Sequence, residues 1–311
     1  RPRAAMEAWS SLRRDGRRPN ELRRLGCEYG AVSGADGSCA FTMGRTKVVA
    51  AVFGPQAKTS GSGGGGSGAG AQLSQFAGPA GAGGSAVVPD VELKVSWAPF
   101  ATQERRTRGR TDRFILELEG LLRSTVESML RFPQSENAAA GGASAGAGAP
   151  HQRSSEVQVK VLVVEADGGV KACCQNAVTC AMAAANLSCG DLVVACCCTP
   201  VASFGNTLKE SRELAAMNLS SRMFLDPNGT ETAKFGELTL SVKATSLGGG
   251  PTSTSAAAGE REEREEEVVS VSCDAKVTPE DLEECLEACG QGCRAIAKFV
   301  RTSVMTHINR V

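Results

Sequence analysis

The sequence has no excess of charge of either sign. Its 311 residues hold 34 Lys and Arg against 34 Asp and Glu. This balance excludes a general attraction of the whole chain to nucleic acid. Any nucleic-acid surface must therefore be a local patch of basic residues.

Long hydrophobic runs are also missing. No apolar run approaches the roughly 20 residues that a membrane-spanning helix needs. Residues 1–18 have no apolar stretch of the kind found in secretory signals. We therefore expect neither a membrane segment nor a secretory leader.

Histidine is scarce, with only His151 and His307, and neither lies beside the paired-cysteine motifs that commonly bind zinc. The cysteines fall in apolar patterns instead. We predict that they are small buried thiols in a reducing compartment, with no metal site and no cofactor. They include Cys173, Cys174 and Cys180 in an Ala-rich helical run, Cys196, Cys197 and Cys198 at a strand end, and Cys285, Cys289 and Cys293 on one helical stripe.

Three segments are poor in apolar residues and rich in Gly, Ala and Ser: 57–86, 137–150 and 248–267. Each buries too little apolar area to offset the entropy of ordering it, so we predict disordered insertions. The acidic string at the end of the third segment is typical of a solvated loop, although it could also dock a basic partner. The rest of the chain fits a single domain covering residues 1–311.

The remaining segments alternate between strand and helix patterns. Alternating or continuous apolar runs predict strands at 38–43, 46–53, 91–97, 156–166, 192–198, 223–225, 237–244 and 268–273. Helical periodicity predicts helices at 112–131 and 171–185, and a third from Pro279 to about His307 with Thr278 as its N-cap. The predicted fold class is α+β, with helices packed against a mixed sheet.

Several short motifs occur in a recognisable order. They are RDGRR at 14–18 with ELR at 21–23, DGS at 36–38, GRTKV at 44–48, GP at 54–55, EADGG at 165–169 and LDP at 225–227. In this order they resemble RNase PH-like proteins, whose domain has the ribosomal protein S5 domain 2-like fold. The resemblance extends to the RNase PH-like subunits of the eukaryotic RNA exosome ring. The start resembles the ribosomal-RNA-processing type, whereas residues 97–101 and 226–227 resemble the messenger-RNA-transport type, and both remain open.

The resemblance implies a phosphorolytic site that has lost groups it needs. Active relatives have a hydroxyl and an Arg after the DGG-type turn, where this chain has Val170 and Lys171. Asp226 matches one acid of a catalytic pair, but Thr232 stands in place of the second. Glu231 could substitute as a ligand, Lys171 could keep a weak phosphate site, and residues 226–229 could simply form a β-turn. We predict that the chain is not an enzyme.

Basic residues suggest where RNA would lie. The segment 104–113, ERRTRGRTDR, is dense enough in Arg to contact RNA phosphates, although a solvated loop would have the same composition. The predicted RNA-binding residues are Arg105, Arg106, Arg108, Arg110 and Arg113. A second basic run is interpreted as a subunit-interface or fold-specific motif; it contains Arg13, Arg14, Arg17, Arg18, Arg23 and Arg24.

The function implied by this resemblance is that of a non-catalytic exosome ring subunit. It would help to form the channel that guides single-stranded RNA in 3'–5' RNA processing and degradation, including rRNA processing. The expected partners are other RNase PH-like subunits in a six-membered ring, S1/KH cap subunits, an associated exonuclease and single-stranded RNA, with no membrane. The expected location is the nucleus, nucleolus and cytoplasm. Two alternatives stay open: an active phosphate-dependent 3'–5' exoribonuclease, and an assembly module without RNA contact.

Overall fold

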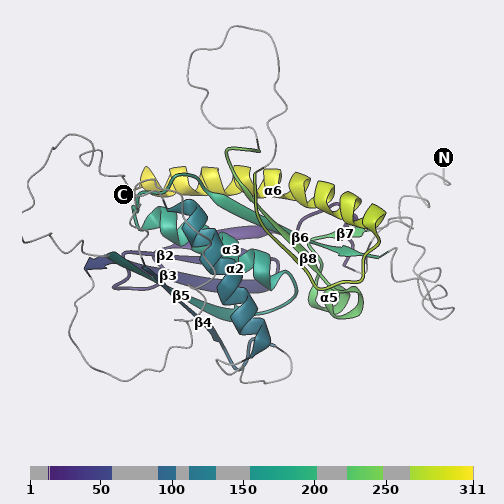
Figure 1. The fold of residues 1–311 in the computed structure, drawn as a ribbon, viewed down its shortest axis with the longest axis horizontal. Coiled ribbons are helices and arrows are strands. Elements are labelled where there is room, and N and C mark those ends of the chain that lie inside the picture. Colours follow the sequence, from purple (N-terminus) through teal and green to yellow (C-terminus); the bar gives the residue numbers. More distant parts are fainter. Residues whose placement is uncertain are drawn as a thin grey trace, which may run out of the picture.

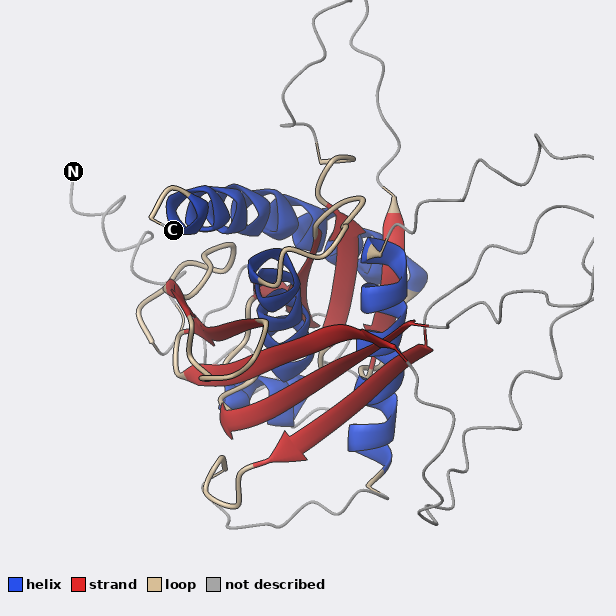
Figure 2. Ribbon diagram, turned by 90° about the vertical axis from the view of Figure 1, so that its left-hand side faces the viewer, coloured by secondary structure: helices blue, strands red, loops and turns tan. Residues whose placement is uncertain are grey.

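The computed structural model describes residue 13 and residues 15–57, 90–102, 112–130, 155–201, 223–247 and 267–310. These residues form two β-sheets and the helices that pack on them (Figures 1 and 2). The predicted insertions lie outside the described residues, except for their ends at Ala57 and Glu267. In the described part of the chain, no helix is both long enough and apolar enough to cross a membrane.

The first sheet has five strands in the order β1-β2-β3-β5-β4. All neighbours are antiparallel except β4 and β5, so the sheet is mixed, as predicted. The predicted hairpin is present, and Gly44 turns it with a φ of 63° that favours glycine. The strands are β1 (Leu25–Tyr29), β2 (Gly37–Met43), β3 (Thr46–Ala57), β4 (Asp90–Trp97) and β5 (Ser155–Glu165).

The second sheet is antiparallel, with four strands in the order β7-β6-β8-β9. Its central strand β6 is buried along its whole length, which explains its continuous run of Val, Ala and Cys. The strands are β6 (Val193–Pro200), β7 (Met223–Leu225), β8 (Leu238–Lys243) and β9 (Val268–Cys273).

Helix α3 (Val170–Ala184) contacts strands of both sheets. It is rich in Ala and Cys, and its residues from Val170 to Met182 are all buried, so small side chains allow close packing. Helix α2 (Arg113–Met129) packs on β4 and α3, with Asp112 as its N-cap. Helix α6 (Pro279–Ile308) packs on β6 and β8 and runs along the side of the molecule away from β4 (Figure 1).

The structure corrects the sequence-based assignment in two places. Strand β1 was not predicted, because its five residues are too short to show a clear alternation. Residues 226–229 do not form an isolated β-turn; Asn228 instead caps the short helix α5 (Gly229–Phe235).

Candidate functional site

Asp226, the predicted surviving acid, is fully buried at the end of β7. Its carboxylate accepts hydrogen bonds from the backbone N–H of Arg23 at 2.8 Å and from Arg23 Nη2 at 2.7 Å. Burial alone would lower the pKa of Arg23, but the hydrogen bond and charge of Asp226 outweigh it and raise that pKa above its ordinary value. Asp226 is thus half of a buried ion pair within the chain.

Arg23 joins three of the sequence motifs. Besides Asp226, its guanidinium donates to the backbone carbonyls of Asp167 and Gly168 in the DGG turn. A φ of 74° at Gly168 suits glycine, and a Cβ there would lie 2.5 Å from the Pro227 carbonyl oxygen. The ELR, DGG and LDP motifs therefore meet at one point, because the buried guanidinium of Arg23 donates to two carbonyls of the DGG turn and to the carboxylate of the LDP motif.

The first basic run also contributes structural contacts. Arg13 is buried, donates to the Leu225 and Asp226 carbonyls, and lies over the Phe224 ring at 4.7 Å. Arg17 donates to the Asp226 carbonyl at 3.1 Å. These contacts favour the fold-specific interpretation for part of the run. Arg18 and Arg24 are exposed, and Arg14 lies outside the described residues.

Glu231 is engaged at the start of α5. Its Oε2 accepts the Asn228 N–H at 2.9 Å while the Asn228 side chain accepts the Glu231 N–H at 3.0 Å, which makes a capping box. Arg13 Nη1 lies 3.6 Å from the same carboxylate. Thr232, one position further along α5, lines a cavity of about 440 Å³. The structure therefore places Glu231 in a helix cap rather than beside Asp226 as a second acid.

The turn that should hold phosphate faces the same cavity, with Gly168, Val170 and Lys171 among its lining residues. Gly169 is the N-cap of α3, and its N–H donates to Glu237 Oε2 at 3.3 Å. The N-terminus of a helix attracts anions, and here the protein's own carboxylate occupies that position. Burial raises the pKa of Glu237 above its ordinary value.

Lys171 is also already paired. Its Nζ lies 2.6 Å from Glu117 Oε1 and 2.5 Å from Asp274 Oδ2, and it donates to Ser272 Oγ at 2.8 Å. Burial alone would lower the pKa of Lys171, but hydrogen bonds to Asp274 and Glu117 raise it. Lys171 thus has two carboxylates around it, and Glu237 lines the same cavity. The local excess of negative charge opposes the binding of phosphate.

Only one predicted RNA-binding residue is within the described part of the chain. Arg113 is exposed at the first position of α2, while Arg105, Arg106, Arg108 and Arg110 lie outside the described residues. The described residues on either side, Thr102 and Phe114, both line the cavity. Phe114 also packs edge-to-face on Trp97 at 5.7 Å. The described residues that flank the arginine-rich segment therefore lie at the cavity.

Sequence reasoning missed the carboxylates that occupy this site. Glu117, Asp274 and Glu237 come from α2, the end of β9 and the start of β8, and nothing in their local sequence marks them. Arg23 was visible in the ELR motif, but its pairing with Asp226 joins residues 203 positions apart. Such contacts become evident only in the folded chain.

Two sheets pack around α3, and a cavity is bordered by the DGG turn and helix α5; together these features define an RNase PH-like domain. A family model described as "3' exoribonuclease family, domain 1" matches residues 21–188, which is more than half of the chain. The chain belongs to this family. The predicted resemblance and the α+β fold class are thereby confirmed.

Curated relatives carry exosome names. The exosome complex component RRP41 homolog of Arabidopsis thaliana is 29% identical over 290 residues, covering 93% of this chain and 90% of that protein. Exosome complex component RRP41 of Mus musculus is 32% identical over 185 residues, covering 58% of this chain and 60% of that protein.

Two solved structures show the same fold. The crystal structure of rice (Oryza sativa) Rrp46 superposes with a TM-score of 0.61 at 20% identity, covering 94% of this chain and all of that one. A structure titled as the Archaeoglobus fulgidus exosome with RNA bound to the active site gives a TM-score of 0.57 at 13% identity, covering 96% of each chain.

Proposed function

We propose that this chain is a non-catalytic ring subunit of the RNA exosome, which helps to form the channel for single-stranded RNA in 3'–5' processing and degradation, including rRNA processing. The family membership and the exosome names of its relatives support the assignment to this assembly. The proposed location, in keeping with this role, is the nucleus, nucleolus and cytoplasm.

One observation supports the proposed absence of catalysis: the charged groups expected to act in the site are already paired with other charged groups of the same chain. Asp226 is paired with Arg23, and Lys171 with Glu117 and Asp274. Phosphorolysis needs a cation and amide donors free to hold phosphate, and an acid free to act on a metal or a leaving group. Recruiting Asp226 would mean breaking its buried ion pair with Arg23, at a cost of several kcal/mol. Recruiting Lys171 would mean displacing two partly exposed carboxylates.

Exposed apolar residues on a sheet edge support the proposed partners. Strand β9 is at the edge of its sheet, and it leaves Val268 50% and Val271 48% exposed. An apolar edge strand is a typical surface for pairing with a neighbouring chain. The proposed neighbours are other RNase PH-like subunits in a six-membered ring, with S1/KH cap subunits and an associated exonuclease. Purified alone, the chain should self-associate; a monodisperse monomer at micromolar concentration would count against the ring.

Phosphate-dependent release of nucleoside diphosphates from the 3' end of RNA tests the absence of catalysis. We expect no release by the purified chain or by a ring reconstituted with it. The Lys171→Met variant serves as the control, because Lys171 is the cation in the first turn of α3, where phosphate would bind. Release that requires phosphate and is lost with Lys171→Met would establish the active exoribonuclease instead.

RNA retention by the assembled complex tests the proposed path. Replacing Arg105, Arg106, Arg108 and Arg110 by Glu should weaken retention, and the remaining binding should depend less steeply on salt, by about 0.7 in the log–log slope for each lost phosphate contact. The control reverses the charge of two exposed cations elsewhere in the chain, Arg123→Glu and Lys298→Glu. Equal weakening by the control, or no weakening by the test variant, would support an assembly module without specific RNA contact.

A further inference from the structure

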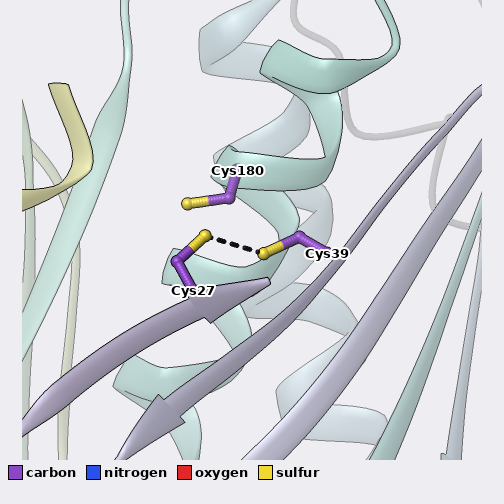
Figure 3. Close-up of side chains that lie close together, drawn as sticks. All are labelled: Cys27, Cys39 and Cys180. Atoms are coloured by element: carbon purple, nitrogen blue, oxygen red, sulfur yellow. Dashed lines mark hydrogen bonds between the residues drawn. The ribbon is translucent and has the colours of Figure 1, made fainter. Parts of the chain in front are cut away.

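Three cysteine side chains from separate elements converge on one point. Cys27 comes from β1, Cys39 from β2 and Cys180 from α3, and their sulfur atoms all lie within 4.8 Å of one another. The Sγ atoms of Cys27 and Cys39 are 3.1 Å apart (Figure 3). Sequence analysis treated the cysteines as separate small apolar side chains. The fold instead brings three thiols to a common centre.

The strand register explains the convergence. Cys27 lies opposite Phe41, and Cys39 lies opposite Tyr29, so the two cysteines are diagonal neighbours on adjacent strands. Diagonal neighbours on one face have Cα atoms roughly 7–8 Å apart, still within reach of each other's side chains. Cys180, fully buried on α3, approaches the same face because α3 packs against β1 and β2.

A disulfide accounts for this arrangement poorly. A Cα separation above about 7 Å cannot be bridged without movement of the backbone, and diagonal neighbours are at that limit. A bridge between Cys27 and Cys39 would also leave the third thiol without a role. Three sulfur ligands around one ion of zinc-like size, each about 2.3 Å from it, would be about 4 Å from one another, which fits the observed spacing after small side-chain shifts.

We propose that Cys27, Cys39 and Cys180 form a binding site for a thiophilic d¹⁰ cation, Zn²⁺ or Cu⁺. Thiolate ligands select these ions over magnesium, calcium and manganese, which prefer oxygen. Three thiolates complete a trigonal site for Cu⁺, whereas Zn²⁺ takes a fourth ligand from the solvent side. This site is separate from the cavity at Lys171, and the proposal does not depend on the exosome function.

The site has an entry path. Cys27 is half-buried and lines an open groove of about 600 Å³ between β1 and α6, which also includes His307 and Arg310. An ion therefore reaches the cluster from the side of Cys27, and the thiols release their protons to water as it binds.

Metal titration of the full, reduced chain in competition with a chromophoric chelator tests the site, with Zn²⁺ and Cu⁺ in separate arms. We expect one ion per chain in at least one arm. X-ray absorption should then show three sulfur ligands at about 2.3 Å. Cys27→Ser should weaken binding by more than the roughly 10- to 100-fold that loss of an outer-shell partner costs. The matched control is Cys273→Ser, which removes an exposed thiol elsewhere and should leave binding unchanged.

Thermal melting shows whether a loss of metal binding is due to misfolding of the variant. Cys27 is half-buried and serine is nearly isosteric, so Cys27→Ser should melt close to the metal-free wild type. The ion should raise the Tm of the wild type and of Cys273→Ser, but not that of Cys27→Ser. The proposal is overturned if neither ion binds, if fewer than three sulfurs ligate it, if Cys27→Ser and Cys273→Ser lose binding equally, or if mapping finds a Cys27–Cys39 disulfide in the purified protein.

Discussion

Replacing Asp226 by Asn tests whether this residue is structural or catalytic. The amide has the shape of the carboxylate but carries no charge. One of its two ends must present an NH₂ group, so either the Arg23 backbone N–H or Arg23 Nη2 loses its acceptor. The Arg23 guanidinium would then stay buried without a charged partner.

The expected cost follows from burial. The side chains of Arg23 and Asp226 are 7% and 0% exposed, so solvent cannot screen the unpaired charge. Breaking a buried ion pair by removing one partner costs about 3–5 kcal/mol. A typical domain has only about 5–15 kcal/mol of stability in total, so this variant should lose a large part of it.

Chemical denaturation measures this loss, with Asp274→Asn as the control. That variant also removes a carboxylate from a close ion pair, but Asp274 is 54% exposed and Lys171 keeps Glu117, so we expect at most about 1 kcal/mol. RNA decay by the assembled complex should be unchanged while Asp226→Asn remains folded. Full stability of Asp226→Asn combined with loss of RNA decay would refute the structural role and reveal a working acid.

Three further variants test other parts of the structure. Burial raises the pKa of Glu237 in the fold, so its ionised form opposes folding; Glu237→Gln should increase the free energy of unfolding at pH 7, and the gain should vanish as the pH falls below the ordinary value of 4.5. A gain that persists at low pH would contradict this. A Cβ at Gly292 of α6 would lie 2.5 Å from Cys196 Sγ, so Gly292→Ala should destabilise by about 1–3 kcal/mol. Gly120 of α2 has open space around it, so Gly120→Ala should stabilise by about 0.5–1 kcal/mol in the same denaturation assay; changes of equal sign would contradict the packing of α6.

Local patterns were enough to predict most of the elements. The β2–β3 hairpin and the N-terminus of α6 depend on residues close in sequence: Gly44 at a turn, and Thr278 before a proline. Strand β1 and helix α5 were missed because they are short, with five and seven residues. The Asn228–Glu231 capping box was a readable signal, yet the preceding Asp226-Pro227 pair favoured a turn.

The candidate site, too, was predictable from the sequence only in part. The motif order identified the family, and the residues at Val170 and Thr232 led to the prediction of a damaged site, because both steps need only the identity of residues at particular positions. Which charges neutralise one another depends on distance in space, and the Arg23–Asp226 pair joins parts of the chain 203 positions apart. The convergence of Cys27, Cys39 and Cys180 likewise arises from strand register and helix packing, which no local pattern encodes.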